Sequence, residues 1–155
     1  MGASCSACAE DARWYVEDRR LAKCTTKNCV NFMPDVKRAK VVKVYDGDSI
    51  TVAARHGRRG PPTLFKVRLA GIDSPEMRGG SAAEKEAAVL ARDYLAGLIL
   101  EKNVTLSNLQ KEKYGRVLAN VSYRGSDMSA ALVAHGHAVA YDGGTKKAFN
   151  EPDVV

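Results

Sequence analysis

Alternating apolar and polar residues predict a set of short β-strands in the second two thirds of the chain. The clearest run is residues 64–69, where Phe65, Val67 and Leu69 alternate with basic residues, so that one face is buried and the other exposed. An Asp-Gly pair at residues 46–47 predicts a turn between the first two strands. In order along the chain, the expected strands are residues 41–45, 49–53, 64–69, 104–106, 117–123 and 138–141.

Two helices are expected between and after these strands. Ser81 and Glu84 have the spacing of a capping box, which predicts that a long helix begins there. Apolar residues follow at spacings of three and four, which gives this helix one apolar face: Ala87, Leu90, Ala91, Tyr94, Leu95 and Leu98. A second, shorter helix is expected over residues 128–135 and ends at Gly136. Five or so short strands with a long helix after the third predict an α+β fold, a closed or partly closed β-barrel with helices.

Composition is that of an ordinary globular protein with a basic excess. The 155 residues are 45% hydrophobic and 27% charged, and the net charge is +6. Residues 1–40 hold eight basic and five acidic side chains, and residues 41–142 hold fourteen and eleven, so the excess is spread evenly. This charge favours an anionic partner, with nucleic acid as the first candidate. No apolar run is long enough to span a bilayer and no secretory signal is visible, so we expect an intracellular protein without membrane association.

The cysteines are confined to the N-terminal region. Their spacing is C-x2-C, then fifteen residues, then C-x4-C, at Cys5, Cys8, Cys24 and Cys29. Both pair spacings suit a tetrahedral Zn²⁺ site, and a metal would stabilise a segment that has few large apolar residues. An arm without metal and a pair of disulfides are the alternatives, although the absence of a signal disfavours an oxidising compartment.

These features divide the chain into three parts. Residues 1–40 form a cysteine-rich arm that ends in a linker over residues 31–40, where Pro34 blocks a helix. Residues 41–142 form the barrel domain, with an exposed basic loop over residues 56–62 that either contacts a nucleic-acid backbone or is simply solvated. Residues 143–155 are a short polar tail.

Chemically useful residues gather at three predicted strand ends or turns. They are the segments 46–48 (Asp-Gly-Asp), 73–76 (Asp-Ser-Pro-Glu) and 114–116 (Tyr-Gly-Arg), to which Arg68 adds a second guanidinium. Carboxylates collected on loops suit a hard cation such as Ca²⁺ or Mg²⁺, and arginine forks suit phosphate oxygens. Taken singly, each segment reads more simply as a turn or a surface residue, so the inference depends on their combination.

That combination resembles the staphylococcal-nuclease-like (thermonuclease) family over residues 41–141. The resemblance rests on four blocks in order: Val44-Tyr45-Asp46-Gly47-Asp48-Ser49, Val67 to Glu76, Lys113-Tyr114-Gly115-Arg116-Val117-Leu118-Ala119, and Ala131 to Gly136. It implies an OB-type five-stranded barrel with helices. It also implies a Ca²⁺-dependent phosphodiesterase that hydrolyses DNA and RNA, and we expect it to act as a monomer.

The resemblance further implies a role for each matched residue. Asp48, Asp73 and the backbone carbonyl of Ser74 correspond to metal ligands, with Ser where the family commonly has Thr. Arg68 and Arg116 correspond to the arginines that clamp the phosphate, and Glu76 to the residue assigned as general base. Lys113 and Tyr114 correspond to residues that contact the nucleotide.

The main alternative is a member of this family that binds nucleic acid or serves as a scaffold without cutting. Such domains typically lose the acidic ligands or the arginines, and all six positions are filled here. A phosphatase of the haloacid-dehalogenase type lacks its later acidic pair, and an EF-hand fails because Ile50 stands at a ligand position. The histidines His56, His135 and His137 do not have the spacing of a metal site.

Overall fold

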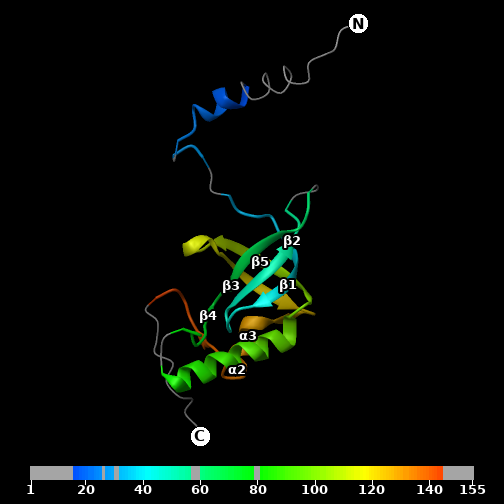
Figure 1. Cartoon of the computed structure of the whole chain (residues 1–155), viewed down its shortest axis with the longest axis vertical. Coiled ribbons are helices and arrows are strands. Elements are labelled where there is room, and N and C mark those ends of the chain that lie inside the picture. The colour runs from blue at the N-terminus through cyan, green and yellow to red at the C-terminus, as the bar shows by residue number, and fades with distance from the viewer. Residues whose placement is uncertain (1–15, 26, 30–31, 57–59, 79–80, 145–155) are drawn as a thin grey trace. The chain divides into compact units, whose positions relative to one another are not determined.

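A computed structural model describes residues 16–25, 27–29, 32–56, 60–78 and 81–144 of the chain (Figure 1). Met1–Phe32 and Met33–Val155 are separate compact units. In the first unit, residues 16–21 are helical and the residues described after them form turns. The second unit holds the strands and the two helices discussed below, and it carries the candidate site.

Five strands of the second unit, within the described residues, form a closed barrel. Their bounds are β1 Arg38–Val44, β2 Ser49–Ala54, β3 Thr63–Leu69, β5 Asn103–Lys111 and β6 Val117–Tyr123. Neighbours in the order β3-β2-β1-β5-β6 pair antiparallel, and a parallel pairing between β3 and β6 closes the barrel. The two-residue strands are β4 Ile72–Asp73, β7 Ser126–Asp127 and β8 Val139–Ala140. The predicted barrel with helices is therefore confirmed.

The inward-facing residues of the strands form the core, as the alternating pattern predicted. In β3, Val67 and Leu69 are fully buried whereas Lys66 is exposed. The largest buried side chains come from the strands and from both helices: Val41, Ile50, Val52, Val67, Leu69, Leu95, Ile99, Val104, Val121 and Leu132. At roughly 1.5–3 kcal/mol for each fully buried side chain, this cluster is the main stabilising element of the unit.

Both helices lie at one end of the barrel, next to each other (Figure 1). Helix α2 spans Ala82–Ile99 and begins with the predicted capping box: the Ser81 hydroxyl accepts from the Glu84 N–H, and the Glu84 carboxylate accepts from the Ser81 N–H. Helix α3 spans Met128–Ala134, and Asp127 caps its N-terminus. Among the helices that the structure describes, not one combines the length and the apolar character that a membrane crossing requires.

Two predicted boundaries were wrong. The linker expected over residues 31–40 is partly strand, because Val36 and Ala39 are buried in the core and Arg38 already pairs with Thr105. Strand β5 runs well beyond the predicted residues 104–106, because its polar second half pairs with β6 across an irregularity near Asn108, whose φ is 52°. The predicted loop over residues 56–62 does separate β2 from β3, but residues 57–59 lie outside the described residues.

Candidate active site

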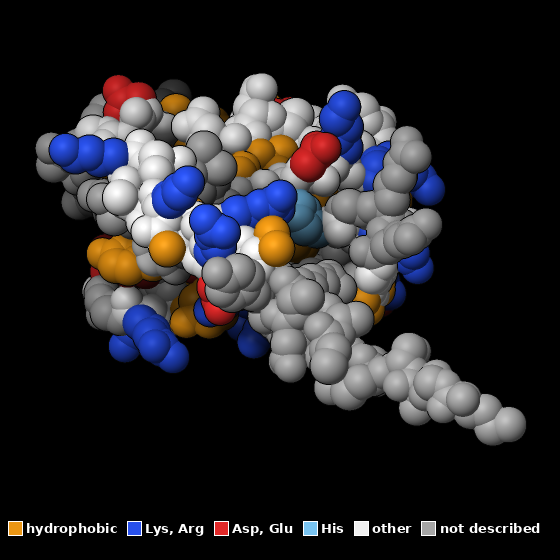
Figure 2. All heavy atoms as spheres, turned by 90° about the horizontal axis from the view of Figure 1, so that it is seen from above, with side chains coloured by type: hydrophobic (Ala, Val, Ile, Leu, Met, Phe, Trp, Pro, Cys, Tyr) orange, Lys and Arg blue, Asp and Glu red, His pale blue; other side chains and the backbone are white. Residues whose placement is uncertain are grey.

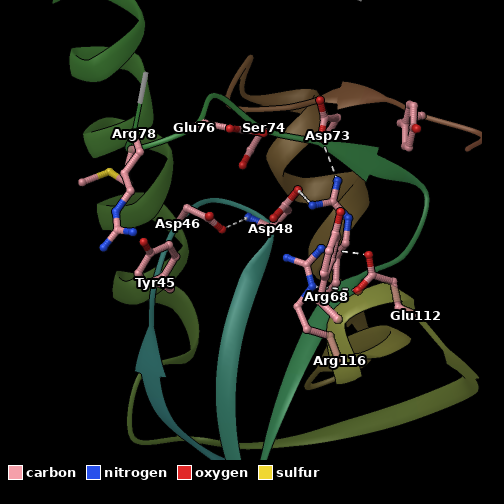
Figure 3. Close-up of a pocket in the computed structure, with 13 residues that line it drawn as sticks. Tyr45, Asp46, Asp48, Arg68, Asp73, Ser74, Glu76, Arg78, Glu112 and Arg116 are labelled. Atoms are coloured by element: carbon pink, nitrogen blue, oxygen red, sulfur yellow. Dashed lines mark hydrogen bonds and ion pairs between the residues drawn. The ribbon is translucent and has the colours of Figure 1, made fainter. Parts of the chain in front are cut away.

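A cavity of about 470 Å³ opens at the ends of β1, β2 and β3. It collects the turn between β1 and β2, the segment after β4, the turn between β5 and β6, and one residue after β8 (Figure 3). Its lining residues are Tyr45, Asp46, Asp48, Arg68, Asp73, Ser74, Glu76, Met77, Arg78, Glu112, Tyr114, Arg116 and Tyr141. Three segments far apart in sequence thus contribute charged groups to one site.

Gly47 lets the turn between β1 and β2 approach the rest of the site. A Cβ atom at this position would lie 2.8 Å from the Cβ atoms of both Ala91 and Ser74, so there is no room for a side chain. The Asp46 carboxylate accepts a hydrogen bond of 3.2 Å from the Asp48 N–H, which closes the turn. Local turn chemistry and close packing against α2 together fix the position of Asp48.

Arg68 lies between the two aspartates that the sequence predicted as metal ligands (Figure 3). Its Nη1 is 2.6 Å from Oδ2 of Asp48, and its Nη2 is 2.7 Å from Oδ1 of Asp73. The Asp48 side chain is only 4% exposed, the Asp73 side chain 11% and the Arg68 side chain 13%. Arg68 is held by the pairing of β3 with β2, and Asp73 by the pairing of β4 with β8.

The carboxyl group of Asp48 has an unusually high pKa. Burial, and then the nearby negative charge of Asp46, raise the pKa of Asp48 to about 7, although Arg68 and the Ser49 hydroxyl favour the ionised form. The ion pair with Arg68 therefore compensates the buried carboxylate only in part. Oxygen donors with incomplete compensation are the kind of group that a hard cation stabilises.

Arg116 is held from the other side of the cavity. Its Nε and Nη2 donate to the two carboxylate oxygens of Glu112 at 2.7 and 2.8 Å, and its Nη1 lies 3.5 Å from the Ser49 hydroxyl. The hydrogen bonds that Arg116 donates to Glu112 raise the pKa of Arg116 above its already high ordinary value, so the guanidinium stays charged.

The turn between β5 and β6 brings Glu112 and Arg116 together. It is the short 3-10 segment η1, Lys113–Gly115, in which Tyr114 has φ 66° and Gly115 has φ 74°. The Glu112 N–H donates to the Arg116 carbonyl at 3.1 Å, which closes the turn. Tyr114 stands at the rim of the cavity and is 91% exposed.

The structure brings most of the predicted site residues together. Those that line the cavity are Asp48, Arg68, Asp73, Ser74, Glu76, Tyr114 and Arg116, and Lys113 lies on η1 beside Tyr114. Sequence reasoning missed Glu112, Tyr45, Met77, Arg78 and Tyr141, and it gave Asp46 no role. The spacing of Glu112 four residues before Arg116 was an available signal, but outside a helix such a spacing does not imply a contact.

The predicted zinc ligands lie in the first unit. Cys5 and Cys8 fall outside the described residues, whereas Cys24 and Cys29 are exposed free thiols. The Asn28 side chain organises the loop between these two, because it accepts from the Thr25 N–H at 2.6 Å and donates to the Lys23 carbonyl at 2.8 Å. The Cys29 side chain raises the pKa of Cys24 above its ordinary value. Within the described residues, no three His, Cys, Asp or Glu side chains converge closely enough to form a metal site by themselves.

Comparison with known proteins gives matches over the same part of the chain. The family described as staphylococcal nuclease homologue matches residues 66–153. A Haemophilus influenzae protein named "Uncharacterized endonuclease" is 34% identical over 102 residues, which are 66% of this chain and 51% of that protein. The "Micrococcal nuclease" of Shigella flexneri is 33% identical over 113 residues, 67% of this chain and 58% of that protein.

A third organism contains a protein that matches at a similar identity. "Endonuclease Htp3" of Saprolegnia parasitica is 32% identical over 121 residues, which are 67% of this chain and 56% of that protein. The chain thus spans about half the length of the curated relatives it matches.

Proposed function

Because this chain belongs to the staphylococcal nuclease homologue family, we propose that it is a Ca²⁺-dependent nuclease that hydrolyses phosphodiester bonds of DNA and RNA. The observation that carries the proposal is the meeting of two arginines and three acidic side chains in one cavity: Arg68, Arg116, Asp48, Asp73 and Glu76. The names of the relatives, which include a micrococcal nuclease and several endonucleases, support the same activity.

The donor atoms of the cavity suit Ca²⁺. Asp48 and Asp73 supply carboxylate oxygens, Ser74 is buried beside them, and Ca²⁺ binds oxygen ligands of this type. We propose that these three residues hold the ion, with Ser74 acting through its carbonyl. When bound, Ca²⁺ would supply positive charge that stabilises the phosphate oxygens as negative charge develops on them.

The two arginines bind the scissile phosphate in this proposal. Their guanidiniums are planar and permanently charged, and each presents a fork of N–H groups to phosphate oxygens. Arg116 is already oriented by Glu112, so little ordering remains when a substrate arrives. Lys113 and Tyr114, on the turn at the cavity rim, contact the nucleotide.

Glu76 acts as the general base in this proposal. It is exposed and lines the cavity, so it can accept a proton from a water molecule that attacks phosphorus. The new P–O bond forms as the bond from phosphorus to the 5′-oxygen breaks, and the 5′-oxygen takes a proton from solvent. The products are a 3′-phosphate and a 5′-hydroxyl.

A nucleic-acid-binding module without activity is the second candidate. The first unit and the basic excess of the whole chain are compatible with binding alone. The full set of carboxylates and arginines in the cavity favours the enzyme, because binding to phosphate does not require buried carboxylates beside it.

A cleavage assay separates these two functions. Purified protein is incubated with a labelled single-stranded DNA or RNA oligonucleotide, in Ca²⁺ or in a chelator, together with the variants Glu76→Gln and Arg68→Ala. We expect cleavage that requires Ca²⁺ and falls on the order of 10²-fold or more in each variant. The matched controls Glu86→Gln and Arg124→Ala change exposed residues on α2 and after β6, and should keep full activity. Tight binding without cleavage would reject the enzyme in favour of the binding module.

For the first unit we propose a structural zinc site formed by Cys5, Cys8, Cys24 and Cys29. Support comes from the ligand spacing. Metal analysis of protein purified without chelator should find one Zn²⁺ per chain, and Cys24→Ser should abolish it. Four titratable thiols with no bound metal would reject this site.

A further inference from the structure

A second groove adjoins the candidate active site on the outer face of the barrel. Its volume is about 340 Å³, and it shares Tyr45, Asp46 and Arg116 with the first cavity. From β1, β2 and β3 it adds Ser49, Ile50 and Val67 and, at a greater distance from the first cavity along the strands, Lys43, Thr51 and Lys66. A substrate strand held by Arg116 can therefore continue into this groove without leaving the protein surface.

The strand register places Lys43, Thr51 and Lys66 in one row. Lys43 of β1 pairs with Thr51, and Thr51 pairs with Lys66 of β3. Since neighbouring strands lie about 4.8 Å apart, the two lysine Cα atoms lie roughly 10 Å apart on either side of Thr51.

This row runs beside the row formed by Ser49 and Arg68. Ser49 pairs with Arg68, and Thr51 and Lys66 follow at the next positions on the same face of β2 and β3. Two residues along a strand correspond to about 6.6 Å, which is on the scale of one nucleotide step along an extended strand. In the row of Ser49 and Arg68, the Ser49 hydroxyl lies 3.5 Å from Nη1 of Arg116.

The row of Lys43, Thr51 and Lys66 carries positive charge. Lys43 and Lys66 are exposed, and neither forms an ion pair with any residue that the structure describes. By contrast, Lys40, earlier on β1, is paired with Glu101. The acidic lining residue, Asp46, lies where the groove meets the first cavity, and its carboxylate already accepts from the Asp48 N–H. In the face shown in Figure 2, Lys and Arg side chains are likewise spread widely, with fewer Asp and Glu between them.

We propose that the groove formed by Lys43, Thr51 and Lys66 is a subsite for the phosphate next to the scissile one on a polynucleotide strand. The two ammonium groups bind this phosphate from either side, and the Thr51 hydroxyl donates to it. Continuity with Arg116 favours a nucleic-acid strand over an acidic peptide. The proposal rests on the proposed function, since it assumes that the arginines hold a phosphate.

The test compares substrates with one phosphate and with many. The variant Lys43→Gln/Lys66→Gln removes two charges from the groove, and Lys85→Gln/Lys102→Gln removes two from exposed positions on and after α2. On a single-stranded DNA of about 12 nucleotides, the groove variant should raise KM roughly tenfold. On the dinucleotide dTpdT, whose one phosphate is the scissile one, kcat/KM should stay at the wild-type value. Equal behaviour of the two double variants, or an equal loss on dTpdT, would overturn the subsite.

Oligonucleotide binding measured in the presence of a chelator tests the subsite separately from the proposed activity, because the proposed cleavage requires Ca²⁺. Fluorescence anisotropy with the same oligonucleotide, fluorescently labelled, should show that the groove variant lowers the slope of log K against log[salt] by about 0.7, the value for one lost phosphate contact on a single strand. If the wild type cleaves nothing but this slope changes, the proposed function fails and the subsite stands. A different result would reassign the groove. If poly-glutamate displaces the oligonucleotide from the wild type, and the groove variant has the same salt slope as the wild type, the groove is an acidic-peptide site instead.

Discussion

The carboxylate of Glu112 holds the guanidinium of Arg116 in a fork of two hydrogen bonds, 2.7 and 2.8 Å long. A fork of this kind fixes the plane of the guanidinium as well as its position. Nη1 is left to face Ser49 and the cavity, where Arg116 has been proposed to meet the phosphate. Glu112 is therefore a positioning residue that acts through Arg116.

We expect Glu112→Gln to lower kcat about tenfold, with a smaller change in KM. The amide keeps one acceptor oxygen, but its NH2 group cannot accept the second hydrogen bond of the fork. Steady-state kinetics on an oligonucleotide measure both constants, and Glu112→Asp should recover part of the loss. Glu101→Gln, which removes an exposed carboxylate at the opposite end of β5 that pairs with Lys40, serves as the control. Unchanged kcat in Glu112→Gln would mean that Arg116 needs no such support.

The contact between Glu112 and Arg116 shows where prediction from sequence stopped. The residues between them adopt positive φ at Tyr114 and Gly115, and this reversal brings the two ends of the turn together. A tyrosine rarely adopts that backbone conformation, so its residue type gives no signal for it. Tyr141 was missed for a different reason: it follows a two-residue strand whose pairing with β4 is a long-range contact.

Much of the fold could be predicted because its signals are local. The Ser81–Glu84 capping box set the start of α2, and the alternation in residues 64–69 set both faces of β3. The parallel pairing of Val67 with Val117 that closes the barrel leaves no local pattern. The site residues were predicted through their order in four blocks, whereas the ion pairs of Arg68 with Asp48 and Asp73 emerged only in the structure.

Removing Arg68 should leave the negative charges of Asp48 and Asp73 without their ion-pair partner. In Arg68→Ala the buried carboxylates of Asp48 and Asp73 lose their partner, and we expect a loss on the order of 3 kcal/mol of unfolding free energy without metal. Ca²⁺ should restore part of this loss, and it should stabilise the variant more than the wild type because the guanidinium no longer competes with the ion.

Urea unfolding with Ca²⁺ and with chelator measures both effects of this substitution. Arg124→Ala, at an exposed arginine in the turn after β6, is the control and should respond to Ca²⁺ like the wild type. A smaller Ca²⁺ stabilisation in Arg68→Ala than in the wild type would contradict the assignment of Asp48 and Asp73 as ligands.

A methyl group at Gly47 should disturb both stability and activity. In Gly47→Ala the new Cβ would lie 2.8 Å from the Cβ atoms of Ala91 and Ser74, so the turn that carries Asp48 must shift. We expect a cost of about 1–3 kcal/mol in unfolding free energy and a clear loss of cleavage. In the control Gly97→Ala, in open space on α2, the helix should gain about 0.5–1 kcal/mol. If Gly47→Ala is as stable as the wild type, the turn has more room than its contacts indicate.

The stability of the barrel unit should depend on the protonation of His137. Its ring packs on Tyr94 at 4.6 Å between centroids, and His135 packs on the same ring at 4.9 Å. Burial, and then the nearby His135, lower the pKa of His137 below its ordinary value of 6.5. The unfolded chain therefore binds more protons just below pH 6.5, so stability is complete above that pH and declines as the pH falls.

Urea unfolding of the wild type and His137→Gln at about pH 7.5 and about pH 5.5 measures this contribution. The wild type should lose more stability between these two conditions than His137→Gln does, because the glutamine does not titrate. Arg124→Ala, which changes an exposed side chain in the turn after β6, is the control and should keep the wild-type pH dependence. Other groups that titrate in this range contribute alike to all three proteins, so only the difference between them reports on His137. An identical pH dependence in the wild type and His137→Gln would show that protonation of His137 is not linked to folding.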